Sequence, residues 1–480
     1  MKNLFYKTGA LALFAGVLLT SCDPEIDTPS SSAGTADFSS YIAVGNSLSA
    51  GYADNGLTRP GQEASLPAIL ARQFEKAGGG AFEQPLFPEE QANGSGYLRL
   101  AGFTPQGLPI TQPVTSNLAV RGQNEDGGPL YTKYTENVNN LAVPGIKTAD
   151  IKTQGYGSTL GNPYFERLTD NPMQTYLQYV QEQAQAANHT FFSVWMAEND
   201  VLGYATSGGA FESDPKYRIT PVADFDANFT ELLDVLTADD QKGVLMTVPD
   251  VTSVPFFTTL GPSVKQLLGA NNIPGMVALT GSGRDRMPFA AAQIGAAENG
   301  IYFPLTASSY ATLVGQPTGK YWKDLAKQMS KSSNELVINF TLTQLLVNYA
   351  IDTTAMFGLS AGNPLPSALV LDPVEQARIK AATDGYNQII KEQATARDLA
   401  MFDANAYFKS IQGGFAANNV AYSPAFISGN LFSLDGVHPT PRGYAVIANE
   451  VIDAINAKYN ANVPKADITQ YNAVLFPGRQ

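Results

Sequence analysis

The sequence is poor in the side chains that form cross-links and hold soft metal ions. Its 480 residues include one cysteine and two histidines. A single cysteine excludes a disulfide within the chain, and three soft side chains are too few for a zinc site of the Cys/His type, which takes four ligands. Carboxylates alone stay open as metal ligands, although no motif for such a site is present. We therefore predict no metal centre.

Charge is also scarce, and it is mainly of one sign. Only 15% of the residues are charged, and 30 Lys and Arg stand against 43 Asp and Glu, a net charge of −13. A negative surplus repels phosphate backbones, so we expect no nucleic-acid partner. The hydrophobic share of 44% supports a large buried core and argues against disorder.

Near the N-terminus, the apolar run is too short to cross a membrane as a stable helix. It spans Ala10–Leu19, follows Lys2 and Lys7, and precedes the sequence Leu-Thr-Ser-Cys that ends at Cys22. A positive flank, a short apolar segment and small residues are typical of a secretory signal peptide. The ending also resembles a bacterial lipobox, whose cysteine becomes lipid-modified.

This resemblance implies where the protein is located. We expect residues 1–21 to be a lipoprotein signal peptide and Cys22 to become the lipidated first residue of the exported chain. Its acyl chains would then anchor the protein in a lipid bilayer, in this case the bacterial outer membrane, facing the periplasm or the cell surface. Residues 22–37 are rich in serine and contain Pro29 and Gly34, which predicts a flexible tether.

Short apolar runs alternate with longer helical patterns in the rest of the chain. Continuous apolar runs of four to six residues are typical of parallel strands that are covered on both faces. The candidate strands are residues 41–44, 138–143, 191–195, 243–248 and 399–402, and the clearest candidate helices are 173–187, 225–236 and 374–397. This alternation predicts an α/β fold around a central parallel sheet.

The last helix has the clearest pattern. Thr440 is a suitable N-cap, and Pro441 suits the first helical position, where its missing N–H costs nothing. Apolar residues then recur three or four positions apart from Tyr444 to Ile455. The pattern predicts a helix that packs one face on the sheet.

Two long stretches do not fit the alternation. Residues 54–133 and 251–367 are rich in Gly, Pro, Thr and Phe and contain only scattered helical pattern. Because structureless loops of this length are uncommon in compact domains, we interpret both as insertions with their own structure within a domain spanning residues 38–460. Residues 461–480 are then a C-terminal extension. The sequence does not predict the oligomeric state.

A candidate nucleophile follows the first predicted strand. Ser47 lies just beyond the carboxyl end of that strand, where α/β folds place their ligand sites. A serine needs a base to take its proton, and His438 lies directly before the last helix. Asp435, three residues earlier, is placed to orient the imidazole, as the carboxylate of a catalytic triad does.

Candidate oxyanion donors follow two further strands. Gly145 offers a backbone N–H after residues 138–143, and Asn199 offers a side-chain amide after residues 191–195. The N–H of Ser47 itself is the third predicted donor. Loss of one such donor typically raises the barrier by about 3–4 kcal/mol, so these groups matter as much as the base.

Ser47, Gly145, Asn199 and His438 occur in the order and surroundings of the SGNH, or GDSL, hydrolases, which the chain resembles from about Ser40 to Tyr459. The resemblance implies a flavodoxin-like three-layer sandwich with a central parallel sheet, elaborated in this chain by the two insertions. It also implies hydrolysis of a carboxylic ester or a thioester through a serine acyl-enzyme, without a metal or an organic cofactor.

The chain departs from the family pattern at two motifs. Gly-Asp-Ser-Leu is replaced by a sequence with Asn46 in place of aspartate, and we expect Asn46 to replace the hydrogen bonds of that residue. The Gly-x-Asn-Asp element has Ala197 in place of glycine, whose methyl group narrows the turn. Glu198 follows, and an ionised carboxylate facing the site would disfavour an oxyanion. We expect Glu198 to point away.

Other interpretations stay open for several residues. Ser360 lies in a Gly-x-Ser-x-Gly sequence, but the prolines after it do not allow the helix that such a nucleophile elbow needs, so we predict a loop. His189 is predicted to be a surface residue or to end a helix rather than to bind a ligand. The aromatic residues of the second insertion are predicted to pack in a core rather than to line a pocket.

The sequence leaves the substrate open between acetylated carbohydrate, short-chain esters and longer lipids. A second hypothesis is a non-catalytic surface lipoprotein on the same frame, which binds glycans or acts as a scaffold. It is motivated by Ala197, by Glu198 and by the two insertions.

Overall fold

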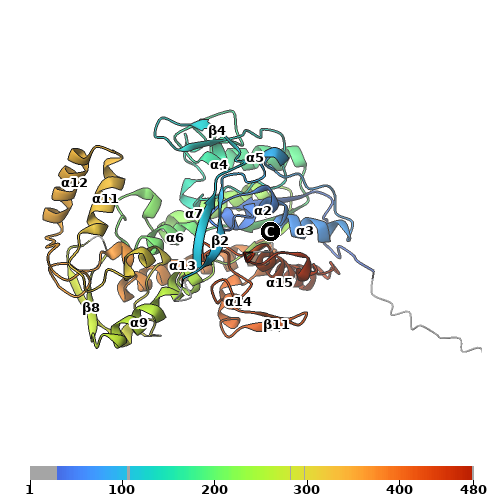
Figure 1. Ribbon diagram of the computed structural model, residues 1–480. Coiled ribbons are helices and arrows are strands. Elements are labelled where there is room, and N and C mark those ends of the chain that lie inside the picture. Colours follow the sequence, from blue (N-terminus) through green and yellow to red (C-terminus); the bar gives the residue numbers. More distant parts are fainter. Residues whose placement is uncertain (1–29, 105–108, 282, 297, 478–480) are drawn as a thin grey trace, which may run out of the picture. The chain divides into compact units, whose positions relative to one another are not determined.

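The computed structural model describes residues 30–104, 109–281, 283–296 and 298–477 (Figure 1). The predicted signal peptide and Cys22 lie outside these residues. Residues 31–480 form one compact unit. No helix in the described part of the chain is long and apolar enough to cross a bilayer.

A four-stranded parallel sheet lies at the centre of this unit. Its strands are β1 (Tyr41–Gly45), β6 (Phe191–Trp195), β7 (Lys242–Met246) and β10 (Ala400–Phe402), in the order β1-β6-β7-β10. All residues of β1 and β6 are buried. The predicted α/β fold around a parallel sheet is confirmed at this level.

The predicted strand at residues 138–143 is not a regular strand. This segment runs beside β1, where the Leu141 N–H donates to the Ala43 carbonyl at 2.8 Å and Asn140 forms a single parallel bridge. The side-chain amide of Asn139 donates to the Tyr41 carbonyl at 3.0 Å. Since asparagine side chains compete for backbone partners in this way, the segment follows the sheet edge without forming a full ladder.

Helices cover both faces of the sheet. Helices α3 (Leu66–Glu75) and α15 (Pro441–Tyr459) pack together on one face, while α5 (Tyr176–Ala187), α7 (Val222–Leu236) and α13 (Pro373–Ala396) form the layer on the other (Figure 1). The Phe191 ring of β6 lies 5.5 Å from Phe74 of α3 and 5.9 Å from Tyr459 of α15. Side chains alternate along a strand, so the next residue, Phe192, faces the opposite layer.

The last helix begins as predicted. The Thr440 hydroxyl accepts a hydrogen bond from the Gly443 N–H at 3.0 Å, and Pro441 occupies the first helical position. The apolar stripe of α15 is buried along the helix. This capping fixes where α15 starts, and with it the position of the loop that carries His438.

Residues 54–133 are not one separate insertion. They contain α3, whose Leu66, Ile69, Leu70 and Phe74 belong to the main core. The boundary prediction is therefore wrong for this helix, because its ten residues give less than three turns of apolar pattern. The stretch also contains two hairpins, β2 (Tyr97–Phe103) with β3 (Pro109–Val114) and β4 (Val120–Gln123) with β5 (Pro129–Tyr131).

Residues 260–370 bury a hydrophobic cluster of their own. It is built from α9 (Leu260–Ala270), the hairpin of β8 (Gly275–Leu279) and β9 (Arg286–Ala290), and the pair α11 (Lys320–Ser330) and α12 (Glu335–Asn348). Phe303 and Tyr321 are buried in this cluster, as predicted, whereas the prediction is wrong for Phe256, which is only partly buried and lines a cavity.

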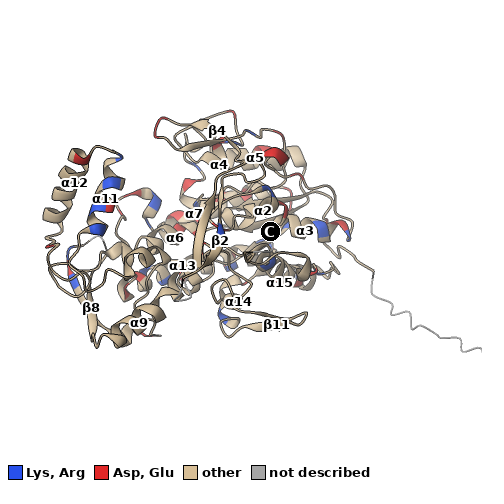
Figure 2. Cartoon of the chain, in the orientation of Figure 1, with Lys and Arg blue, Asp and Glu red and all other residues tan. Residues whose placement is uncertain are grey.

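Charge is distributed unevenly between the two helices of this pair. Several lysines lie along α11, whereas Glu335 is the only charged residue of α12 (Figure 2). The outer face of α12 exposes large apolar side chains, among them Phe340 and Val347.

The predicted tether ends earlier than residue 37. Ser32 forms an antiparallel bridge with Asn462, and the Thr35 N–H donates to the Tyr459 carbonyl at 2.8 Å. Phe38 is buried against Phe74. Residues 31–37 are therefore part of the folded unit, because the end of α15 and the segment after it supply backbone partners for them.

Candidate active site

Ser47 lies where β1 gives way to a short helix, α1 (Ser47–Ala50). The side-chain oxygen of Asn46 accepts a hydrogen bond from the Leu48 N–H at 3.0 Å and caps this helix. Ser47 is the first helical residue, so its own N–H has no partner within the helix. The turn therefore presents both the hydroxyl and a free amide of the same residue.

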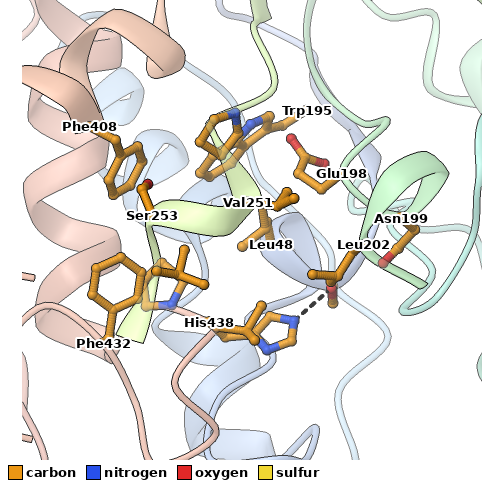
Figure 3. Close-up of a pocket in the computed structure, with 15 residues that line it drawn as sticks. Leu48, Trp195, Glu198, Asn199, Leu202, Val251, Ser253, Phe408, Phe432 and His438 are labelled. Carbon is orange, nitrogen blue, oxygen red and sulfur yellow. Dashed lines mark hydrogen bonds between the residues drawn. The ribbon is translucent and has the colours of Figure 1, made fainter. Parts of the chain in front are cut away.

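The structure brings the three predicted triad residues together. The Ser47 Oγ lies 2.9 Å from His438 Nε2, although the two residues are 391 positions apart (Figure 3). The His438 Nδ1 lies 3.0 Å from an Asp435 carboxylate oxygen. Both distances are those of hydrogen bonds, so a base and an orienting carboxylate are in place beside the serine.

Asp435 is held by three further hydrogen bonds from its own loop and a neighbouring turn. One carboxylate oxygen accepts the N–H groups of Val437 and His438, each at 2.8 Å, and the other accepts the Asn55 N–H at 3.0 Å. Burial raises the pKa of Asp435, but the charge of His438 and these hydrogen bonds outweigh it and lower the pKa to about 2. Asp435 is therefore ionised at neutral pH and fixes the orientation of the imidazole.

Gly436 gives this loop its shape. Its φ is +73°, a conformation that favours glycine, and a Cβ at this position would lie 3.0 Å from the Phe256 backbone nitrogen. The Phe256 N–H donates to the Gly436 carbonyl at 2.9 Å. The segment after β7 thus supports the turn between Asp435 and His438.

Sequence reasoning missed a turn that supports Asp435 from the other side. In the turn Ala53–Gly56, Asp54 and Asn55 have φ values of +53° and +62°. The Asp54 carboxylate accepts the Leu434 N–H at 2.8 Å. Burial raises the pKa of Asp54 to about 6, against the lowering effect of that hydrogen bond. The sequence Asp-Asn-Gly favours such turns and could have indicated this one.

The aromatic ring of Tyr52 also contacts the triad. Its centroid lies 4.7 Å from that of the His438 ring, and the Tyr52 carbonyl accepts a hydrogen bond from the Tyr444 hydroxyl of α15 at 2.8 Å. This packing limits rotation of the imidazole.

The predicted oxyanion donors border one cavity. Ser47, Gly145 and Asn199 all line it, and Gly145 has a φ of +85°, which suits glycine. Asn199 is the first residue of α6 (Asn199–Thr206), and its side-chain amide donates to the Ile146 carbonyl at 3.0 Å. An amide has two N–H groups, so this bond fixes the orientation of Asn199 while the second N–H stays available.

The expectation that Glu198 points away from the site is wrong. Glu198 is buried, lines a cavity next to Ser47, and accepts a hydrogen bond from the Asn46 amide at 2.6 Å (Figure 3). Burial raises the pKa of Glu198 to about 7, although its own backbone N–H and the Asn46 amide lower it. The Asn46 side chain thus bonds on two sides: its oxygen accepts the Leu48 N–H, and its amide donates to Glu198.

Ala197, directly before it, is strained. Its φ of +98° is rare for a residue with a side chain, and Ala197 is fully buried. Such a conformation costs roughly 1–3 kcal/mol, so contacts of the surrounding fold must stabilise a backbone conformation that alanine itself disfavours.

The competing residues lie outside this site. Ser360 occupies a loop, as predicted, and no helix follows it directly. Its hydroxyl accepts the Gly362 N–H at 3.1 Å. His189 follows the end of α5, as predicted, but it is buried rather than on the surface. Its Nε2 lies 3.0 Å from the Leu236 carbonyl, which anchors the ring between two helices.

Comparison of the sequence with protein-family models gives no match, and comparison with curated proteins gives none either. Among the described residues, no three His, Cys, Asp or Glu side chains gather as metal ligands would.

Proposed function

We propose that the protein is a serine hydrolase of the SGNH type that cleaves carboxylic esters. The observation that carries the proposal is the chain of hydrogen bonds from Ser47 to His438 and from His438 to Asp435, at 2.9 and 3.0 Å. A serine, an imidazole and a buried ionised carboxylate in this arrangement form the apparatus for acyl transfer.

The geometry gives each residue a role. His438 takes the proton of Ser47 as its Oγ attacks the ester carbonyl, and Asp435 stabilises the imidazolium that forms. In this proposal, the N–H groups of Ser47, Gly145 and Asn199 receive the developing oxyanion. His438 then protonates the leaving alcohol, and a water molecule releases the acyl group by the reverse sequence.

The order of the sheet supports the flavodoxin-like arrangement of this proposal. With residues 138–143 beside β1, the segments lie in the order second, first, third, fourth and fifth along the chain. In such sheets, ligands bind outside the carboxyl ends of the strands where the order reverses. Ser47 follows β1 and Asn199 follows β6, the two strands on either side of that point.

A fluorophosphonate probe tests the proposal directly, because it reacts only with an activated serine. We expect the wild-type protein to be labelled at Ser47 and Ser47→Ala to stay unlabelled. Ser360→Ala is the matched control and keeps the label. A folded wild-type protein that is not labelled contradicts the proposal.

We also propose that the exported chain is anchored to the outer membrane through a lipidated Cys22. The supporting observation is the lipobox-like sequence that ends at this cysteine. Metabolic labelling with a radioactive fatty acid is expected to mark the wild-type chain and not Cys22→Ser. Equal labelling of both contradicts the anchor.

The alternative, a glycan-binding or scaffolding protein without activity, is favoured by the buried carboxylate of Glu198 beside the site. Turnover of p-nitrophenyl acetate by the purified chain separates the two functions. Activity that disappears in Ser47→Ala supports the hydrolase, and absence of turnover in a folded wild-type protein supports the alternative.

A further inference from the structure

Two cavities of different character meet at Ser47. The first is a narrow cavity of about 40 Å³, which we name the slot (Figure 3). Apart from Ser47, His438 and Asn199, its polar lining residues are Glu198 and Ser253. The other residues are apolar and include Leu48, Trp195, Val251, Phe408 and Phe432.

The second cavity is wide and open, and we name it the groove. It measures about 550 Å³ beside Ser47 and adjoins a further cavity of about 790 Å³, with which it shares Gly145, Tyr164 and Asn199. Partly exposed tyrosines line both parts, among them Tyr52 and Tyr217, and apolar side chains such as Phe256 and Leu305 complete the lining beside Ser47. Each tyrosine offers an apolar ring face and a hydroxyl group.

The two cavities suit different halves of an ester. The acyl group stays bound to Ser47 until water arrives, whereas the alcohol must leave between the two steps. The apolar slot can hold a hydrocarbon group, but it cannot solvate a departing alcohol. The groove is open to solvent and reaches His438, which protonates the alcohol.

We propose that the slot takes a short, uncharged acyl group and that the groove takes a large polar alcohol such as an oligosaccharide. This inference rests on the proposed hydrolase function and adds the class of substrate.

The size of the slot sets the length of the acyl group. The slot measures about 40 Å³ against about 550 Å³ for the groove, so it favours a short acyl chain over a long one. Burial of each methylene raises kcat/KM about fourfold while the slot still has room. Glu198 disfavours acyl groups that end in a negative charge.

The test of the slot is a series of p-nitrophenyl esters from acetate to octanoate. We expect the wild-type kcat/KM to be highest for butyrate, about tenfold above acetate, and to fall below acetate at octanoate. Val251→Phe fills the slot and lowers the ratio of butyrate to acetate at least tenfold. Phe408→Ala extends the slot and raises the ratio of octanoate to butyrate at least tenfold.

Matched controls lie on α12, far along the chain from the slot. Val347→Phe and Phe340→Ala make the same changes at exposed positions and are expected to leave both ratios within twofold. If Val251→Phe fails to fold, the slot is tested by Phe408→Ala alone. Misfolding cannot raise the ratio of octanoate to butyrate, so an increase in this ratio supports the assignment of the slot.

Three outcomes contradict the assignment of the slot to the acyl group. They are a wild-type preference for octanoate, equal kcat/KM values along the series, and slot variants that change kcat/KM for all esters by the same factor. In each case Ser47 is still labelled by the fluorophosphonate probe. Failure of the hydrolase proposal differs, because then Ser47 is unlabelled and no ester is cleaved.

The groove is tested with an acetylated cello-oligosaccharide against p-nitrophenyl acetate. Tyr217→Ala is expected to raise the KM for the oligosaccharide at least fivefold relative to that for p-nitrophenyl acetate. An unchanged ratio, or an oligosaccharide that is not cleaved by the active wild-type protein, overturns the assignment of the groove.

Discussion

Ser47 and Ser360 both lie in glycine-containing sequences, but they differ in secondary structure and in the hydrogen-bond partners of their hydroxyl groups. Ser47 lies at the carboxyl end of a buried parallel strand, 2.9 Å from an imidazole. Ser360 lies in a loop, where its hydroxyl accepts a backbone N–H at 3.1 Å. The comparison teaches that two serines in similar short motifs can have different surroundings: of the two, only Ser47 has an imidazole within hydrogen-bonding distance.

The largest expected effect is on catalysis and comes from substitution of the two serines themselves. Ser47→Ala is expected to lower kcat/KM for p-nitrophenyl acetate by about four to six orders of magnitude, because the covalent path is lost. Ser360→Ala is expected to stay within twofold of the wild type. Steady-state kinetics of both variants measure this, and a similar loss in both contradicts the assignment of Ser47.

The next effect concerns the base that Ser360 lacks. His438→Ala is expected to lower kcat/KM to nearly the same extent as Ser47→Ala, and the double variant to be little worse than either, since the pair acts as one unit. Kinetics of the two single variants and the double variant form the test. If the loss in the double variant equals the product of the two single losses in kcat/KM, the two residues act independently and the prediction is wrong.

Asparagines near the two serines extend the comparison. Asn199→Ala is expected to lower kcat about 10²–10³-fold through loss of an oxyanion donor. Asn363, near Ser360, donates to the carbonyls of Thr318 and Ala355 at 2.9 and 3.0 Å. Asn363→Ala is expected to lower Tm by a few degrees and to leave kcat unchanged. Kinetics and thermal melts of both variants measure the two effects, and the reverse pattern contradicts these roles of the two asparagines.

The smallest effect concerns Glu198, a titratable partner of the Ser47 turn. Its pKa is raised from 4.5 to about 7 in the folded protein, so its contribution to stability is complete below pH 4.5 and is lost as pH rises through 7. Glu198→Gln removes this loss. Relative to the wild type, the free energy of unfolding of the variant is expected to be higher at pH 8 than at pH 4 by on the order of 3 kcal/mol.

Denaturant unfolding at the two pH values measures this gain. Glu392→Gln, a glutamate on the exposed surface of α13, is the control and is expected to show no such change. A gain for Glu198→Gln that does not depend on pH contradicts the raised pKa.

Much of the sheet and the triad could be predicted from the sequence, because each rests on local signals. The buried strands are continuous apolar runs, and α15 begins with Thr440 and Pro441, which fix its start by capping. Asp435 and His438 lie three residues apart, so a single turn is enough to join them. Only the contact between His438 and Ser47 depends on the folded structure, because the two residues are far apart in the sequence.

Other features depend on contacts that no local pattern contains. Glu198 turns toward Asn46, because β1 and β6 are neighbours in the sheet. The sequence pattern places helix α3 in an insertion, since its apolar pattern is short and its partner, α15, lies hundreds of residues later. Residues 138–143 lack a regular ladder because of asparagine side chains, which periodicity does not take into account.

The span between Ser47 and His438 has a consequence for synthesis. At about 5–20 residues per second, a ribosome needs roughly 20–80 s to make the 391 residues that separate the serine from its base. During that interval the nascent polypeptide carries an alcohol without its proton acceptor. Under the proposed function, the nascent chain is therefore inactive toward esters until its last tenth, which contains His438, has been translated and folded.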